Sequence, residues 1–132
     1  MLNFLKNSRG ILGMNARNQL YIKAENTAKA MRLADNKLLA KKKLQESDIP
    51  VPRTVATISN QAELDDMNWD ALPNSFVLKP NHGFGGAGIL IVYGRKKNSP
   101  DWVKADRSSI SIDDLKNHCR NIIDGHFSLS NI

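Results

Sequence analysis

The sequence contains a single cysteine, Cys119, and no long apolar run. One cysteine excludes an internal disulfide and a thiolate-rich metal site, and its helix-like surroundings predict a small buried hydrophobic residue. No apolar stretch approaches the roughly 20 residues of a membrane span, and polar residues interrupt the start of the chain where a signal peptide would be apolar. We therefore expect a cytoplasmic protein without a membrane partner.

Aromatic residues are also scarce, at 6% of the chain, and Tyr21 is the only one between Phe4 and Trp69. Proteins that bind single-stranded nucleic acids place aromatic side chains among their basic residues, so that bases can stack on them. The scarcity of aromatics argues against a basic nucleic-acid-binding module, which stays open as an alternative.

The basic residues are concentrated in the first part of the chain. The formal net charge is +6, and residues 1–53 carry eleven Lys and Arg against four Asp and Glu. On charge alone, such a bias fits nucleic acid, an anionic membrane surface or a phosphorylated small molecule. The length of 132 residues, with 41% hydrophobic and 24% charged residues, is typical of a globular protein with one core.

Cap and turn residues divide the chain into segments of helical and extended character. Residues 1–25 are expected to form an irregular arm that ends in an extended piece at residues 20–22. Residues 26–47 contain helix-forming residues without Gly or Pro, so we expect one or two helices there, capped by Asn26 and Asp35.

The rest of the chain predicts short strands and helices around a glycine-rich loop. Pro50 and Pro52 end the helical region, because proline lacks a backbone N–H and disfavours helical geometry in the preceding residue. The further elements expected are a strand at 54–58, a helix capped by Asn60 and Glu63, strands at 75–80 and 89–93 around a loop at 82–88, a strand around 102–105, and a helix that Ser111 caps and that runs to residue 124. The predicted fold class is α+β, with a small, largely antiparallel sheet and flanking helices.

The strongest chemical signal is FVLKPNHGFGGAGI at residues 76–89. Without Cβ atoms, a loop lets backbone N–H groups close on phosphate oxygens. A dinucleotide-binding motif would require the glycines to open a helix, whereas a strand is expected to follow them, and a Walker loop would end in Gly-Lys-Ser/Thr. In a protein kinase the phosphate lysine follows the loop, but here Lys79 precedes it. An ordinary hairpin turn remains an alternative. The glycines concerned are Gly83, Gly85, Gly86 and Gly88.

Lys79 lies at the end of an apolar strand, where an unpaired ammonium group would be costly. We expect it to contact a phosphate, although an acid such as Asp106 or Asp124 could pair with it instead. His82 is a second candidate phosphate contact, or a loop histidine without a function.

A second signal is the lysine-rich helix within NKLLAKKKLQESDIPVP, residues 36–52. Lys37 and Lys41 are four residues apart and share a face, so Lys37 could reach into a site. Taken alone, a run of lysines on a helix is usually a solvated surface.

Together these motifs resemble the N-terminal part of the ATP-grasp superfamily. There, an Asp-Lys or similar pair begins a helix, a Gly-Ile-Pro-Val-Pro-like element follows, and a strand with Val-x-Lys-Pro precedes a flexible glycine-rich loop. The corresponding residues here are Asn36 and Lys37, residues 48–52, and residues 77–80, and the two lysines are 42 residues apart. The stretches at residues 11–22 and 31–44 also look like α-L-glutamate ligase-like proteins, so the resemblance covers nearly all of the chain. Asn36 replaces the usual Asp, and Asp48 stands where Gly is common.

The resemblance implies an N-terminal arm at 1–25 and the phosphate-covering, N-terminal ATP-grasp subdomain at 26–132, with the C-terminal subdomain absent. It implies an ATP-dependent carboxylate–amine ligase in which Lys37, Lys79 and the glycine-rich loop approach the nucleotide phosphates. The cofactors would be ATP and Mg²⁺, with the metal ligands supplied by the missing C-terminal part. The chain alone is expected to form no amide bond and to bind ATP weakly or not at all.

Two further expectations concern what the chain contacts besides ATP. An inactive nucleotide-binding or phosphate-binding remnant is an alternative to the ligase. The face meant for the missing subdomain should be unusually apolar, which would allow self-association. The candidates to line that face are Ile89, Ile91, Trp102 and Ile122.

Overall fold

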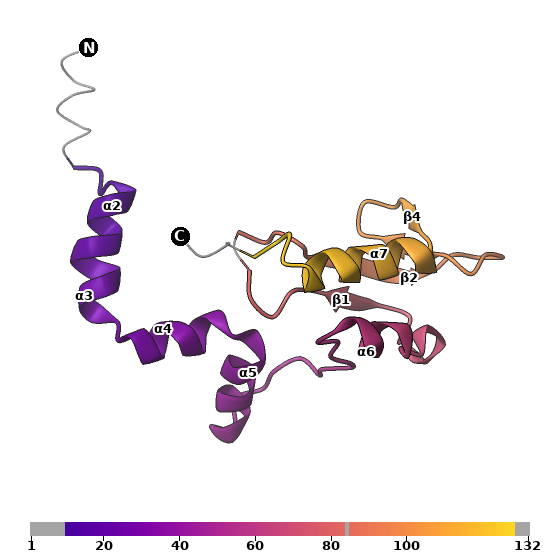
Figure 1. Ribbon diagram of the computed structural model, residues 1–132, viewed down its shortest axis with the longest axis horizontal. Coiled ribbons are helices and arrows are strands. Elements are labelled where there is room, and N and C mark those ends of the chain that lie inside the picture. The colour runs from indigo at the N-terminus through magenta and orange to yellow at the C-terminus, as the bar shows by residue number, and fades with distance from the viewer. Residues whose placement is uncertain (1–9, 84, 129–132) are drawn as a thin grey trace, which may run out of the picture.

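The computed structural model describes residues 10–83 and 85–128. Its first part is a series of helices that lies to one side of the sheet (Figure 1). They are α2 (Met14–Ala16), the π-helical turn η1 (Arg17–Ile22), α3 (Lys23–Glu25), α4 (Ala28–Asp35) and α5 (Lys37–Glu46). None of these helices contains a buried residue.

The irregular arm expected at 1–25 is wrong for the described part of that range, because residues 14–25 are helical without interruption. The predicted extended piece at residues 20–22 lies inside η1. Most residues of this stretch are good helix formers, and it holds no proline or glycine that would end the helix. Residues 1–9 lie outside the described residues.

The two helices expected at 26–47 are confirmed, but each cap is one residue later than predicted. Thr27 caps α4 by accepting a hydrogen bond from the N–H of Ala30 at 3.2 Å. Asn36 caps α5 by accepting from the N–H of Leu39 at 2.9 Å. Asn26 instead follows the end of α3, and its side-chain amide donates to the carbonyl of Ile22 at 2.9 Å.

Residues 49–59 form neither a helix nor a strand, so the strand predicted at 54–58 is wrong. A strand needs a neighbour for its backbone groups, and the described sheet pairs without this segment. The next helix, α6 (Gln61–Asp65), begins as expected, because the side chain of Asn60 accepts from the N–H of Glu63 at 3.0 Å. A short 3₁₀ turn, η2 (Trp69–Ala71), follows.

Four antiparallel strands form the described sheet in the order β1-β2-β3-β4, so the α+β class is confirmed. Their bounds are β1 (Phe76–Leu78), β2 (Leu90–Arg95), β3 (Trp102–Lys104) and β4 (Ser109–Ile110). The two-residue β4 was not predicted, because its length is too short to show an alternating pattern.

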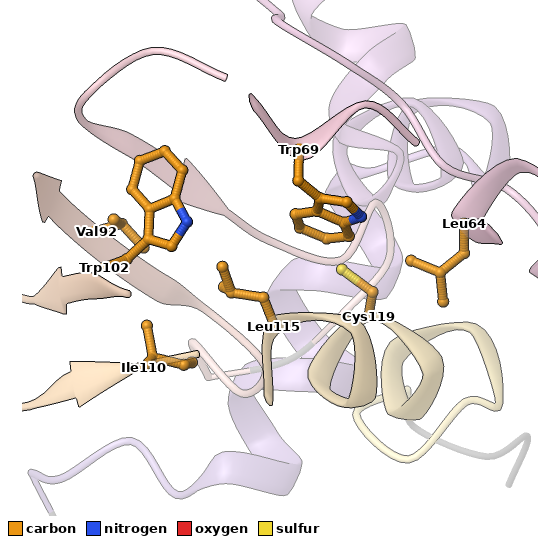
Figure 2. Close-up of a cluster of buried hydrophobic side chains, with 7 residues drawn as sticks. All are labelled: Leu64, Trp69, Val92, Trp102, Ile110, Leu115 and Cys119. Carbon is orange, nitrogen blue, oxygen red and sulfur yellow. The ribbon is translucent and has the colours of Figure 1, made fainter. Parts of the chain in front are cut away.

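The core lies between one face of this sheet and the helices α6 and α7 (Ile112–Ile123) (Figure 2). Ser111 and Asp114 form the predicted capping box at the start of α7, and Gly125 follows its end with φ +82°. Cys119 is buried in this core, as the sequence predicted, and burial raises the pKa of its thiol to about 11. The largest fully buried side chains among the described residues are Leu64, Val92, Trp102 and Leu115.

Candidate functional site

The outer face of the β1–β2 hairpin is not covered by any described helix. Val77 and Ile91 are paired across the two strands, and the two residues are 54% and 45% exposed. Their sequence neighbours Phe76 and Val92 point the other way, into the core. With exposed Tyr93, this face forms a shallow hollow of about 420 Å³.

Lys79 follows β1 directly, and the alternation of an extended chain places it on the same side as Val77. It is exposed, and it has no hydrogen bond or ion pair with another described residue. The pairing with Asp106 considered as an alternative is not observed, because that carboxylate lies 3.5 Å from the ammonium of Lys104. Lys79 is therefore a cation at the edge of an apolar surface, available to an anion.

The glycine-rich loop connects Lys79 with β2. Gly85, Gly86 and Gly88 have φ angles of +60°, +80° and +75°, which side-chain-bearing residues rarely adopt. A Cβ atom at Gly85 would meet no described atom within 4 Å, so there is open space beside this glycine. The backbone N–H of Ile89 donates to the carbonyl of Gly86 at 3.2 Å and closes the turn.

Asn81, which the sequence did not single out, joins helix α5 to the stem of this loop. Its carbonyl accepts from the ammonium of Lys37 at 3.1 Å and from the backbone N–H of Lys37 at 3.3 Å. Its side-chain oxygen accepts from the N–H of Leu38 at 2.9 Å. The first N–H groups of α5 are thereby satisfied. Lys37 is bonded to Asn81, which lies two residues after Lys79 in the chain.

His82 extends the same network rather than standing alone. Because Leu38 occupies the side-chain oxygen of Asn81, the amide nitrogen of Asn81 faces Nε2 of His82, at 3.3 Å. Nε2 must then accept, and Nδ1 carries the hydrogen that it donates to Asp35 at 3.0 Å. The junction of α4 and α5 is thus attached to the residues that follow Lys79.

Other predicted residues are not part of this arrangement. The ammonium of Lys41 donates to the hydroxyl of Thr54 at 2.7 Å, away from the loop. Among the residues expected to line an apolar exposed face, Ile89 is exposed and Ile122 is half-buried, but Trp102 is 0% exposed. Trp102 is wrong as a surface residue because its large ring fills the core; self-association remains a prediction.

A larger groove of about 760 Å³ runs between α4 and α5. Its lining includes Asp35 and His82, which are bonded to each other, and the cap residue Asn36. It includes no residue of the sheet and no glycine of the loop. We therefore assign the candidate site to the outer face of the hairpin, where Lys79 and the loop lie.

The described residues hold no group of three or more His, Cys, Asp or Glu side chains that could bind a metal ion. None of the described helices combines the length and apolar character that a transmembrane segment requires.

Comparison with protein families gives one match. The family described as "Sugar-transfer associated ATP-grasp" matches residues 16–132. No curated protein and no solved structure matches.

Proposed function

The chain belongs to the sugar-transfer associated ATP-grasp family, and on that basis we propose that it holds ATP on the outer face of the β1–β2 hairpin for a carboxylate–amine ligase reaction. The purine would lie on Val77 and Ile91, and the triphosphate would extend past Lys79 under the glycine-rich loop. The observation that carries the proposal is Lys79, an exposed cation without a described partner between an apolar face and a loop of glycines.

The residues of this face fit a nucleotide in charge, shape and polarity. An exposed apolar pair suits a purine ring, and an ammonium group suits phosphate oxygens. The backbone of Gly85 and Gly86 can approach an anion closely, because no side chain obstructs it and their φ angles are positive. An apolar pair, a lysine and a run of glycines are each common features. Here all three lie within residues 77–91.

Lys37 is the second cation of the proposed site. One of its three ammonium hydrogens is directed to the carbonyl of Asn81, so that two remain for phosphate oxygens. His82, with a side chain 54% exposed, lies at the same junction and could contact phosphate only by exchanging its bond to Asn81. Its proposed contribution is therefore smaller than that of either lysine.

In the proposed reaction, a substrate carboxylate oxygen attacks the γ-phosphorus of ATP, and ADP leaves. An amine then attacks the acyl carbon of the acyl phosphate, phosphate leaves, and an amide forms. Lys37 and Lys79 would neutralise the phosphate charge during transfer, and the loop would exclude water from the acyl phosphate. The glutamate-ligase-like substrate class comes from sequence resemblance.

Magnesium ordinarily neutralises phosphate charge in such transfers. The described residues provide no cluster of metal ligands, so the roles above are derived for the lysines and the loop alone.

The proposal is tested by titrating the protein with ATP and with adenosine while recording backbone amide NMR spectra. We expect ATP to shift the signals of Lys79 and residues 85–88, with an affinity in the millimolar range. Lys79→Ala should weaken ATP binding by roughly tenfold, the effect of losing one charge-assisted contact of about 1.5 kcal/mol, and should weaken adenosine binding less.

Lys97→Ala is the matched control, because Lys97 is an exposed lysine in the turn after β2, at the far end of the hairpin. It should leave ATP binding unchanged. Equal loss in the two variants, or shifts confined to α4 and α5, would contradict the proposed site.

The reaction itself is tested with hydroxylamine, which traps acyl phosphates as hydroxamates. Because this chain alone is expected to form no amide bond, the assay uses a protein that joins it to the C-terminal subdomain of an ATP-grasp enzyme. There, hydroxamate formed from L-glutamate only with ATP and an intact Lys79 would support the ligase reaction. ATP-dependent phosphate release without any hydroxamate would contradict it.

A further inference from the structure

The two ends of the glycine-rich loop meet at the turn that follows α7. This turn holds Phe127, which lies 39 residues after Gly88 in the sequence and belongs to a different part of the fold. His118, on α7, contacts the backbone carbonyl of Gly88 at the end of the loop. Neither residue is needed by the nucleotide face described above.

At the C-terminal end of the loop, Nε2 of His118 lies 2.9 Å from the carbonyl oxygen of Gly88. A carbonyl only accepts, so the imidazole N–H must donate. The rings of His118 and Phe127 lie against each other, with centroids 5.4 Å apart. The ring of Phe127 also covers Gly88 so closely that a Cβ atom there would come within 2.9 Å of it.

The N-terminal end of the loop reaches the same turn. A Cβ atom at Gly83 would lie 3.1 Å from the ring of Pro80, which is buried, and 3.7 Å from the carbonyl oxygen of Phe127. In contrast, Gly85 has nothing within that reach, and Gly86 has only the tip of Ile89 at 4.0 Å. Among the described residues, contacts are therefore concentrated at Gly83 and Gly88 and are sparse at Gly85 and Gly86.

We infer that His118 and Phe127 are positioning residues that fix the two ends of the glycine-rich loop at Gly83 and Gly88 (its neck), so that Gly85 and Gly86 can move toward phosphate while these ends stay in place. A loop whose ends are fixed loses less conformational freedom on closing than a loop that moves as a whole. The hydrogen bond of His118 also orients the Gly88 peptide, where the loop turns into β2. The inference deepens the proposed function and rests on it for the part that concerns phosphate.

The first measurement uses no nucleotide and follows amide hydrogen exchange by NMR. In His118→Ala, we expect the amides of Ile89 and Leu90, next to the neck, to exchange roughly 2- to 12-fold faster, as the loss of one hydrogen bond predicts. Amides in the middle of α7 should keep their rates. Faster exchange throughout α7 and β3 would show a role in overall stability instead, and would overturn the inference.

Two further variants make the result specific. His118→Gln keeps an N–H donor at a similar reach from the backbone and should restore slow exchange at Ile89 and Leu90. His126→Ala removes an exposed histidine from the turn itself, whose side chain has no hydrogen bond with a described residue, and should change nothing. If His118→Gln behaved like His118→Ala, the hydrogen bond would not be the cause.

The second measurement is the dissociation constant for ATP in the same variants. We expect His118→Ala to weaken ATP binding roughly 2- to 12-fold, and His118→Gln to bind like the wild type. If the wild-type protein bound no ATP, while exchange at the neck still depended on His118, the proposed function would fail and the fixed neck would stand. Unchanged amide exchange in His118→Ala would contradict the inference that His118 fixes the ends of the loop, whatever the affinity for ATP.

Discussion

Gly85 and Gly88 both have positive φ angles, but their surroundings differ. A Cβ atom at Gly85 would extend into open space, whereas at Gly88 it would meet the ring of Phe127 at 2.9 Å. A positive φ alone costs a residue with a side chain about 1–2 kcal/mol. The difference between the two sites therefore isolates the packing of Phe127 from the strain of the backbone.

We predict that Gly85→Ala lowers the free energy of unfolding by about 1–2 kcal/mol, from backbone strain alone. Gly88→Ala should cost about 1–3 kcal/mol more, because the added methyl group displaces the ring. Urea denaturation followed by tryptophan fluorescence measures both. Gly13→Ala is the control, since Gly13 has φ −64° and nothing within 4 Å. Equal costs at Gly85 and Gly88 would mean that Phe127 does not pack on the loop.

At the scale of the elements, α5 is held at its start by two asparagines that play different parts. Asn36 caps the helix as the residue directly before it, and Asn81 accepts from the N–H groups of Lys37 and Leu38, which are 44 and 43 residues away in the sequence. A substitution of Asn81 removes the side-chain oxygen that accepts from Leu38. It leaves the backbone carbonyl that accepts from Lys37.

We predict that Asn81→Ala frees the start of α5 from the loop. The N–H of Leu38 loses its acceptor, and His82 loses the amide that fixes its ring. The amide of Leu38 should exchange roughly 2- to 12-fold faster, and stability should fall by about 1 kcal/mol. Thr27→Ala removes the cap of α4 only and should leave Leu38 unchanged. Slow exchange at Leu38 in Asn81→Ala would show that Asn36 suffices.

Considered as a whole, the molecule has one compact core and a helical arm with little attachment to it. The core joins α6, the sheet and α7, and it contains both tryptophans, Trp69 and Trp102. No described residue at 10–26 is buried, and the hydrogen bonds described for that range stay within it. The arm therefore contributes little apolar burial to folding.

We predict that Leu20→Ala, at an exposed position of this arm, changes the free energy of unfolding by less than about 0.5 kcal/mol, as for surface changes in general. Leu115→Ala, a fully buried position, should instead cost about 2–5 kcal/mol. Tryptophan fluorescence during urea denaturation reports on both changes, because the two indoles lie in the core. A loss above 1 kcal/mol in Leu20→Ala would show that the arm packs on the core.

The sequence by itself determined the features that depend on neighbouring residues. The capping pairs at Asn60 and Ser111, the strands on both sides of the glycine-rich loop, and the break at Pro50 and Pro52 were all predicted, because each follows from local geometry or from a short-range hydrogen bond. The prediction failed at residues 20–22 and 54–58, where local preference for an extended chain was read as a strand. One segment is helical and the other has no partner strand.

Only the tertiary structure decided which distant groups meet. That Asn81 holds Lys37, that His82 pairs with Asp35, and that Trp102 is buried while Ile91 is exposed all depend on contacts between residues far apart in the chain. The same is true of His118 and Phe127 at the neck of the loop. Such contacts are set by how the elements pack, and packing leaves no short-range pattern in the sequence, because each partner on its own is an ordinary polar or aromatic residue.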